Sequence, residues 1–326
     1  MTPADLSRCV VRAVRRAVED GELPAEAVVP ERVVVERTRP GGVGDYATPV
    51  AFRIAKSVGR RPGEVADVLA RRLGGAPGIE RADVTGAGFL NFTLVSGSAA
   101  GLVRDVRARG SRYGYADGAV ETEPFRWAPT AGLRQRAVHE ATVRLVRSQG
   151  EGYDGPWPSV APVAKRDGDV VVRYGADAVR WAVLTVPARE TPEFSDVLLV
   201  QGEASEFFRV RYAHARSRAL IGNASDLGFG AEAGDVDDAG APALIRALAD
   251  YPLVLEAAAH HRAPERLARH LVEVADALLD FQHCVLPKGD EKPSAAHRAR
   301  LALAEAAGTV LAGGLALLGM DAPERL

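Results

Sequence analysis

The sequence predicts a small α+β domain followed by an all-α helical domain. The first observation is the length of 326 residues, which allows two domains and a sizeable core. The second is that strand-like runs, at residues 79–84 and 88–94, lie near the N-terminus among helical patterns. The third is that residues 196–326 repeat apolar side chains at helical spacing. We therefore place the α+β domain at 1–114, a middle segment at 115–195 and the helical domain at 196–326.

The first domain is expected to open with a helix. Thr2 and Pro3 suit a cap and a first turn, and Leu6, Val10 and Val14 begin an apolar stripe. The later elements, in chain order, are a strand at Val33–Val35, a glycine loop at 41–44, helices at 48–58 and 62–73, the two strands at 79–84 and 88–94, and a helix at 98–109.

The C-terminal domain is expected to contain helices only. Nothing breaks a helix between Ser205 and Leu220, and a Gly/Asp/Ala loop follows at 222–240. The next helices begin at Pro242, run over 264–284 with the apolar spacing of a bundle seam, and end the chain over 300–318.

Composition and charge limit the classes of partner. The chain is 47% hydrophobic and 26% charged, with a net charge of −2, so no global basic field attracts a polyanion. Cys9 and Cys284, far apart in sequence, argue against a disulfide framework or a thiolate metal site. No apolar run suggests a membrane span, and the N-terminus lacks a signal core. We expect a cytoplasmic protein without metal or cofactor.

The helix at 205–220 is the most informative stretch. Phe208, Tyr212 and Ala215 share one face, with arginines at 209, 211, 216 and 218 around it. Aromatic rings among guanidinium groups suit nucleic acid, where bases stack and phosphates pair with arginine. The alternative is an amphipathic core helix with a solvated basic side.

Five local patterns resemble arginyl-tRNA synthetases. Residues 211–216 are similar to the "QYAHAR" helix that opens the anticodon-binding domain of that family. Residues 44–48 resemble its N-terminal "GDYAT" turn, and residues 86–92 its "GPGFINF" strand. Residues 175–180 resemble the "GADAVR" helix that leads to the anticodon domain, and the C-terminus resembles "LLGVSAPERM".

The resemblance implies two tRNA-contacting regions. In that family the N-terminal domain grips the tRNA elbow, and the resemblance implies that Phe89 and Asn91 face a D-loop base. It also places Asp45 and Tyr46 of the turn in the elbow-binding site. The alternative is that Phe89 fills the core and Asn91 bonds backbone. In the C-terminal domain it implies an anticodon-binding-like site made of Phe208, Arg209, Tyr212, Arg216 and Leu326.

This second site departs from the family pattern. Ser205, Glu206, Arg209 and Arg211 stand where the family usually has Asn, Pro, Tyr and Gln. The change at 209 removes a stacking partner, and the two arginines add phosphate attraction. Anticodon specificity is therefore open.

The middle segment resembles the two ends of a class I catalytic domain joined together. Residues 128–133 are similar to the entry of the first signature, yet the next four residues, Arg134-Gln135-Arg136-Ala137, contain neither of its two histidines nor its glycine. Ten residues separate Asp154 from Lys165, where the second signature would end. A βαβ unit needs about 30 residues, so the catalytic Rossmann fold is expected to be largely deleted.

These observations predict a non-catalytic, tRNA-binding relative of the synthetases, to which a protein partner could supply catalysis. One alternative is an enzyme with a rebuilt middle site, for which the candidates are Arg134, Arg136, His139 and Glu140. Another is a protein-interaction scaffold without RNA. The histidines at 260, 261 and 270 lack a carboxylate or Cys partner at ligand spacing, so we expect no metal.

Overall fold

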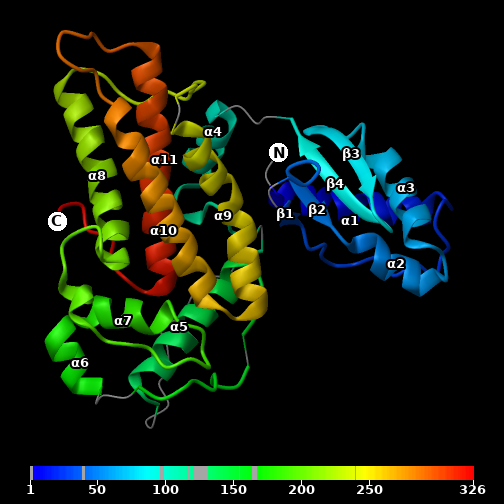
Figure 1. The fold of residues 1–326 in the computed structure, drawn as a ribbon, viewed down its shortest axis with the longest axis horizontal. Coiled ribbons are helices and arrows are strands. Elements are labelled where there is room, and N and C mark those ends of the chain that lie inside the picture. Colours follow the sequence, from blue (N-terminus) through cyan, green and yellow to red (C-terminus); the bar gives the residue numbers. More distant parts are fainter. Residues whose placement is uncertain are drawn as a thin grey trace. The chain divides into compact units, whose positions relative to one another are not determined.

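A computed structural model describes residues 3–38, 41–95, 99–116, 118–119, 131–153, 155–163, 167–238 and 240–326. The chain divides into two compact units, Met1–Gly97 and Ser98–Leu326 (Figure 1). Each unit has its own hydrophobic core. The expected cap residue Thr2 and the lysine-loop remnant at Lys165 lie outside the described residues.

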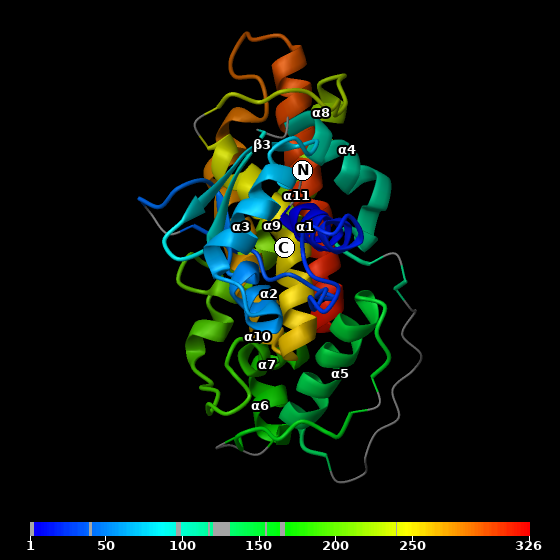
Figure 2. The same cartoon turned by 90° about the vertical axis from the view of Figure 1, so that its right-hand side faces the viewer.

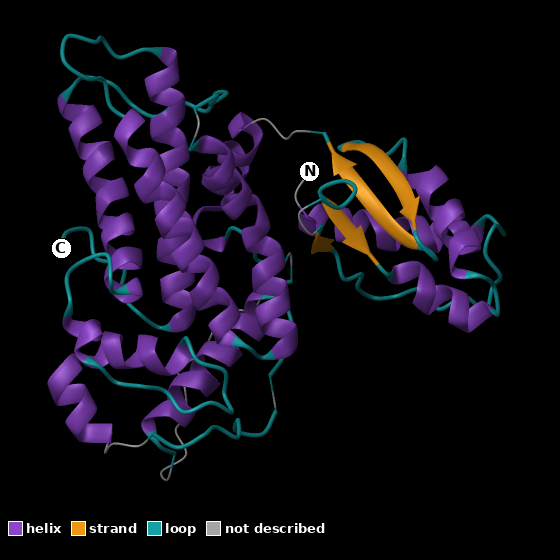
Figure 3. Cartoon of the chain, viewed as in Figure 1, coloured by secondary structure: helices purple, strands orange, loops and turns teal. Residues whose placement is uncertain are grey.

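The first unit is a four-stranded antiparallel sheet covered by helices on one face (Figure 3). The strand order is β1-β2-β4-β3, and every neighbouring pair is antiparallel. The strands are β1 Glu36–Arg37, β2 Tyr46–Thr48, β3 Ile79–Thr85 and β4 Phe89–Leu94, and the helices are α1 Pro3–Glu19, α2 Val50–Val58 and α3 Pro62–Leu73.

The core of this unit forms as the apolar spacing predicts. Leu6, Val10 and Val14 of α1 are fully buried, and so are Leu90 and Phe92 on the inner face of β4. One expected strand is wrong, because residues 33–35 pair with no described strand. That segment is instead an irregular connection in which Val33 and Val35 are buried and Val34 is exposed, and the Ser7 hydroxyl donates to the Val33 carbonyl at 2.6 Å.

The second unit is helical throughout its described residues. Its helices are α4 Ala99–Arg109, α5 Leu133–Ser148, α6 Asp167–Tyr174, α7 Ala176–Leu184, α8 Glu206–Asp226, α9 Ala241–His261, α10 Pro264–Phe281 and α11 Ala295–Leu318, with short 3-10 turns η1 Gly110–Arg112, η2 Asp196–Leu199 and η3 Gln282–Cys284. Helices α5, α6 and α7 lie together at one end of the α8–α11 bundle (Figures 1 and 2).

The expected domain boundary at residue 114 is wrong. Helix α4 packs against α9 and α11, and Val103, Val106 and Tyr113 belong to the core of the second unit. The boundary therefore lies before α4. The middle segment and the C-terminal helices also share one core, since Trp181 of α7 lies 5.8 Å from Phe207 of α8, centroid to centroid.

A small-residue contact fixes the pairing of α8 with α11. A Cβ at Gly308 would meet the Ser217 hydroxyl oxygen, so the two helices approach closely at this point. Helix α11 is long and apolar enough to cross a membrane, but 78% of its apolar window is buried inside the protein. It therefore serves as the central core helix of this unit.

The described residues contain no pair of parallel strands. The fold is thus a small α+β unit followed by a helical unit, as the sequence predicts.

Candidate nucleic-acid interface

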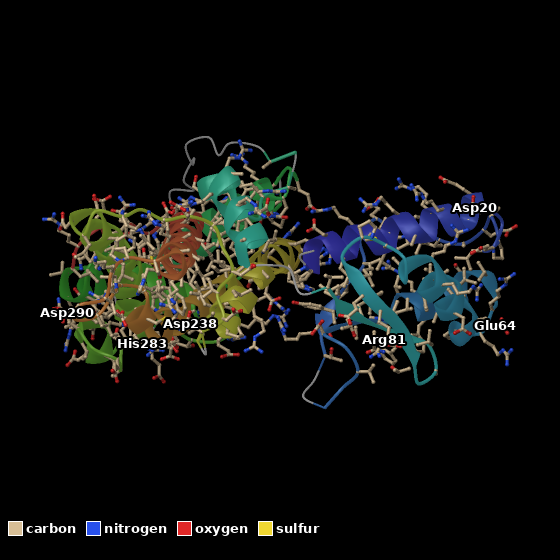
Figure 4. The ribbon with its side chains drawn as sticks, turned by 90° about the horizontal axis from the view of Figure 1, so that it is seen from above. Asp20, Glu64, Arg81, Asp238, His283 and Asp290 are labelled. Carbon is tan, nitrogen blue, oxygen red and sulfur yellow. The ribbon has the colours of Figure 1, made fainter. Side chains whose placement is uncertain are left out.

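Strand β4 presents one face of the first unit to solvent. Its residues alternate, so that Leu90 and Phe92 point into the core while Phe89, Asn91 and Thr93 lie on the opposite face. The helices of the unit pack on the core side. Arg81 of β3, labelled in Figure 4, pairs with Thr93 on the open face and forms a 2.7 Å ion pair with Asp83.

Phe89 is the exposed aromatic of this face. Its side chain is 45% exposed, and its ring meets the edge of Phe52 at a centroid distance of 5.0 Å and an interplanar angle of 61°. This edge contact holds the ring in place and leaves part of it open. The arrangement suits stacking of an unpaired base. Phe52 was not among the predicted site residues, because only the fold brings α2 beside β4.

Asn91 differs from the expectation that it faces a base. It is 4% exposed, and its amide nitrogen donates to the Thr85 hydroxyl at 2.6 Å. The alternative, that Asn91 bonds backbone, describes only its longer contact, at 3.5 Å, with the Phe89 carbonyl. Its closer partner is the side chain of the neighbouring strand β3, so the carboxamide helps to fix the end of β4 that carries Phe89.

Asp45 and Tyr46 hold the preceding turn against β4. The Asp45 amide donates to the Phe92 carbonyl at 2.7 Å, and its carboxylate accepts from the Leu94 amide at 2.9 Å. Tyr46 is 6% exposed, and its hydroxyl accepts from Arg37 at 3.0 Å. Its ring is thus a core group rather than a stacking surface. Both residues contact the Phe92–Leu94 end of β4, the opposite end of the strand from Phe89, and hold the turn and β2 in place there.

Helix α8 presents a second pair of aromatic rings. The rings of Phe208 and Tyr212 are stacked at 5.4 Å and 12°, and Tyr212 is 38% exposed. The Ser205 hydroxyl caps the helix by accepting from the Phe208 amide at 3.3 Å. The cap fixes the first turn and with it the position of this pair.

Most arginines of α8 are paired within the unit. Arg209 donates to the carboxylate of Asp276 at 2.8 and 3.3 Å, and Arg216 donates to the Gln282 carboxamide at 2.6 Å. Arg209 is therefore not the free phosphate-binding cation that the sequence suggested. Sequence reasoning missed its partner because the two residues lie 67 positions apart.

The C-terminal tail returns along α8. The imidazole Nδ1 of His214 lies 2.9 Å from the Pro323 carbonyl, and burial lowers the pKa of His214. Arg218 pairs with Glu324 at 3.4 Å. These contacts bring Leu326, which is 58% exposed, to the same hollow as Phe208.

Two candidates for a rebuilt catalytic site, Arg134 and Glu140, make buried internal contacts. Arg134 is 2% exposed and donates to the carbonyls of Ala161 and Pro187 at 2.8 and 2.9 Å. Glu140, 3% exposed, accepts from Arg180 at 2.5 Å. These contacts give both residues structural roles, in joining α5 to the connecting loops and to α7.

The other two candidates of that group also pack internally. The ring of His139 stacks on Trp157 at 4.1 Å, and burial lowers the pKa of His139. The guanidinium of Arg136 donates to the Ala131 carbonyl at 3.0 Å.

No group of three or more metal-ligating side chains exists among the described residues. His270 is buried between the Ala247 carbonyl, at 2.9 Å, and Glu273, at 3.2 Å.

Two family models match the two ends of the chain. The model described as "Arginyl tRNA synthetase N terminal domain" matches residues 5–94, and the "DALR anticodon binding domain" matches residues 210–326. The chain belongs to the arginyl-tRNA synthetase family. The exposed rings of Phe89 and of Tyr212 thus lie in its two recognised domains.

Curated relatives of this arginyl-tRNA synthetase family member carry the name arginine–tRNA ligase. The protein from Frankia alni is 26% identical over an alignment of 554 residues that spans 100% of both chains, although the present chain has 326 residues. The protein from Micrococcus luteus is 40% identical over 162 residues, which cover 46% of this chain and 29% of that relative.

Solved arginyl-tRNA synthetases share the fold. The superposition on the Thermus thermophilus enzyme has a TM-score of 0.64 at 14% identity and covers 100% of both chains. The superposition on the Plasmodium falciparum enzyme has a TM-score of 0.61 at 8% identity and covers 99% of both chains.

Proposed function

We propose that this protein is a non-catalytic arginyl-tRNA synthetase-like protein that binds tRNA, with tRNA-Arg as the first candidate, through both of its units. The observation that carries the proposal is the match of its two ends to the N-terminal and anticodon-binding domains of the synthetases. Each end exposes an aromatic ring, at Phe89 and at Tyr212, on which an unpaired base can stack.

The non-catalytic role is supported by the segment between those domains. Arg134 and Ala137 stand where the first class I signature would place its two histidines. Arg134 and Glu140, two candidates for a rebuilt site, are committed to internal contacts. A protein partner would then supply any chemistry on the bound tRNA, in the cytoplasm.

Binding and catalysis are tested separately. Filter binding of labelled tRNA-Arg to the full chain at low salt should show saturable binding. Affinity should fall steeply with added salt, because phosphate contacts release counterions. Arginine-dependent exchange of pyrophosphate into ATP should stay at background. Absence of tRNA binding would overturn the proposal that the protein binds tRNA. Measurable pyrophosphate exchange would overturn the proposal that it is non-catalytic.

A further inference from the structure

We infer that a hollow beside the start of α8 receives one guanine base of the bound RNA, an inference that rests on the proposed function. The hollow has a volume of about 490 Å³, within the range of about 300–1,000 Å³ typical of small-ligand sites. The start of α7, residues 198–201, the start of α8 and Leu326 form its walls. All of them belong to the second unit.

Arg211 supplies the positive side of the hollow. Its guanidinium carbon lies 5.2 Å from the centroid of the Phe207 ring, and its Nε is buried without a hydrogen-bond partner among the described residues. The other arginines of α8 are paired with Asp276, Gln282 and Glu324. Arg211 is therefore the arginine of α8 that lines the hollow without a charged partner among the described residues.

Asp177 supplies the negative side. It lies in the first turn of α7, is partly exposed and lines the same hollow. Within the described part of the chain no hydrogen bond or ion pair joins its carboxylate to Arg211 or to another side chain. The hollow therefore offers a donor group and an acceptor group at once. A phosphate alone would satisfy Arg211 but would be repelled by Asp177.

The remaining walls suit a flat ring. Phe208 lines the hollow and is stacked on Tyr212, and Leu326, 58% exposed, adds an apolar edge. Tyr174 and residues 198–200 complete a surface that is mostly apolar and aromatic. Such a site favours a nucleobase over an extended polar ligand.

Guanine is the base whose edges match both charged groups. Its O6 and N7 accept a bidentate pair of hydrogen bonds from a guanidinium, and its N1–H and N2–H donate to a carboxylate. Cytosine and adenine carry an amino group where guanine carries O6. Uracil offers a single ring N–H donor. The combination of Arg211 with Asp177 therefore selects guanine.

The test uses an RNA hairpin with a uridine loop that contains one guanine. Its affinity for the full chain is compared with that of an all-uridine loop and of loops carrying 7-deazaguanine, which lacks N7, or inosine, which lacks the 2-amino group. Variants R211Q and D177N remove one side of the site each. The controls R104Q and D226N make the same charge changes at exposed positions of α4 and α8.

The wild-type chain and both controls should prefer the guanine loop about tenfold over the uridine loop. R211Q should bind the guanine and 7-deazaguanine loops equally, and D177N should bind the guanine and inosine loops equally. Equal binding of all loops by the wild type, with tRNA-Arg still bound, would overturn this inference alone. Loss of binding to every RNA, tRNA-Arg included, would overturn the proposed function as well.

Discussion

Replacing Phe89 by leucine should weaken tRNA binding without unfolding the first unit. The side chain is 45% exposed, and its ring packs against that of Phe52 at a centroid distance of 5.0 Å. Loss of that edge contact costs at most about 1.5 kcal/mol in the free energy of unfolding, because leucine keeps apolar contact. Loss of a stacked base costs about 1–3 kcal/mol, which corresponds to a roughly 5- to 150-fold weaker Kd.

The assay pairs filter binding of tRNA-Arg with urea unfolding of the same preparations. F89W keeps an aromatic face and should bind nearly as well as the wild type. V28A, which changes another apolar side chain of the same unit that is 54% exposed, should change neither quantity. The reasoning is refuted if F89L binds tRNA as tightly as the wild type, or if its weaker binding follows only from unfolding.

Three further predictions concern the helical unit. G308A should lower the free energy of unfolding by about 1–3 kcal/mol, because the added methyl group meets the Ser217 hydroxyl between α8 and α11; an unchanged urea midpoint would contradict this close approach. E140Q should lower the free energy of unfolding by up to about 3 kcal/mol, because it removes a buried carboxylate that two arginines share. An unchanged melting temperature would show that these ion pairs contribute little to stability. Burial lowers the pKa of His139 below its ordinary value of 6.5, so the free energy of unfolding should fall as the pH falls below about 6.5. The variant H139F keeps the stack on Trp157 and should flatten this pH dependence in urea titrations. An equal pH dependence in H139F would assign the effect to other groups.

The elements with strong local patterns were predictable from sequence. Residues 62–73 form the expected helix, since Pro62 starts it and Val65, Val68 and Leu69 face the core. The structure of residues 33–35 was not predictable from sequence. Their β-branched side chains favour an extended chain and do not say whether a neighbouring strand pairs with it. Helix α6 was also missed, since its eight residues carry too short a pattern.

The predicted site residues differ in how far the structure exposes them, and Tyr46 is buried in the core. Phe89 and Tyr212 expose part of their rings where the resemblance placed them. Asn91 and Arg209 satisfy their polar groups internally, on Thr85 and Asp276, and only the register of the strands and the packing of α8 on α10 decide this. The orphan donor of Arg211 depends on the same packing and could not be inferred from its position in the helix.

The proposal that both units contact RNA is tested most directly by one measurement, the equilibrium binding of tRNA-Arg to the intact chain at low salt. The wild type should bind saturably, and a double variant, F89L with Y212A, should bind more weakly than either single variant because each change removes a stacking ring from a different unit. Equal affinity of the wild type and the double variant, or no binding by either, would contradict the account.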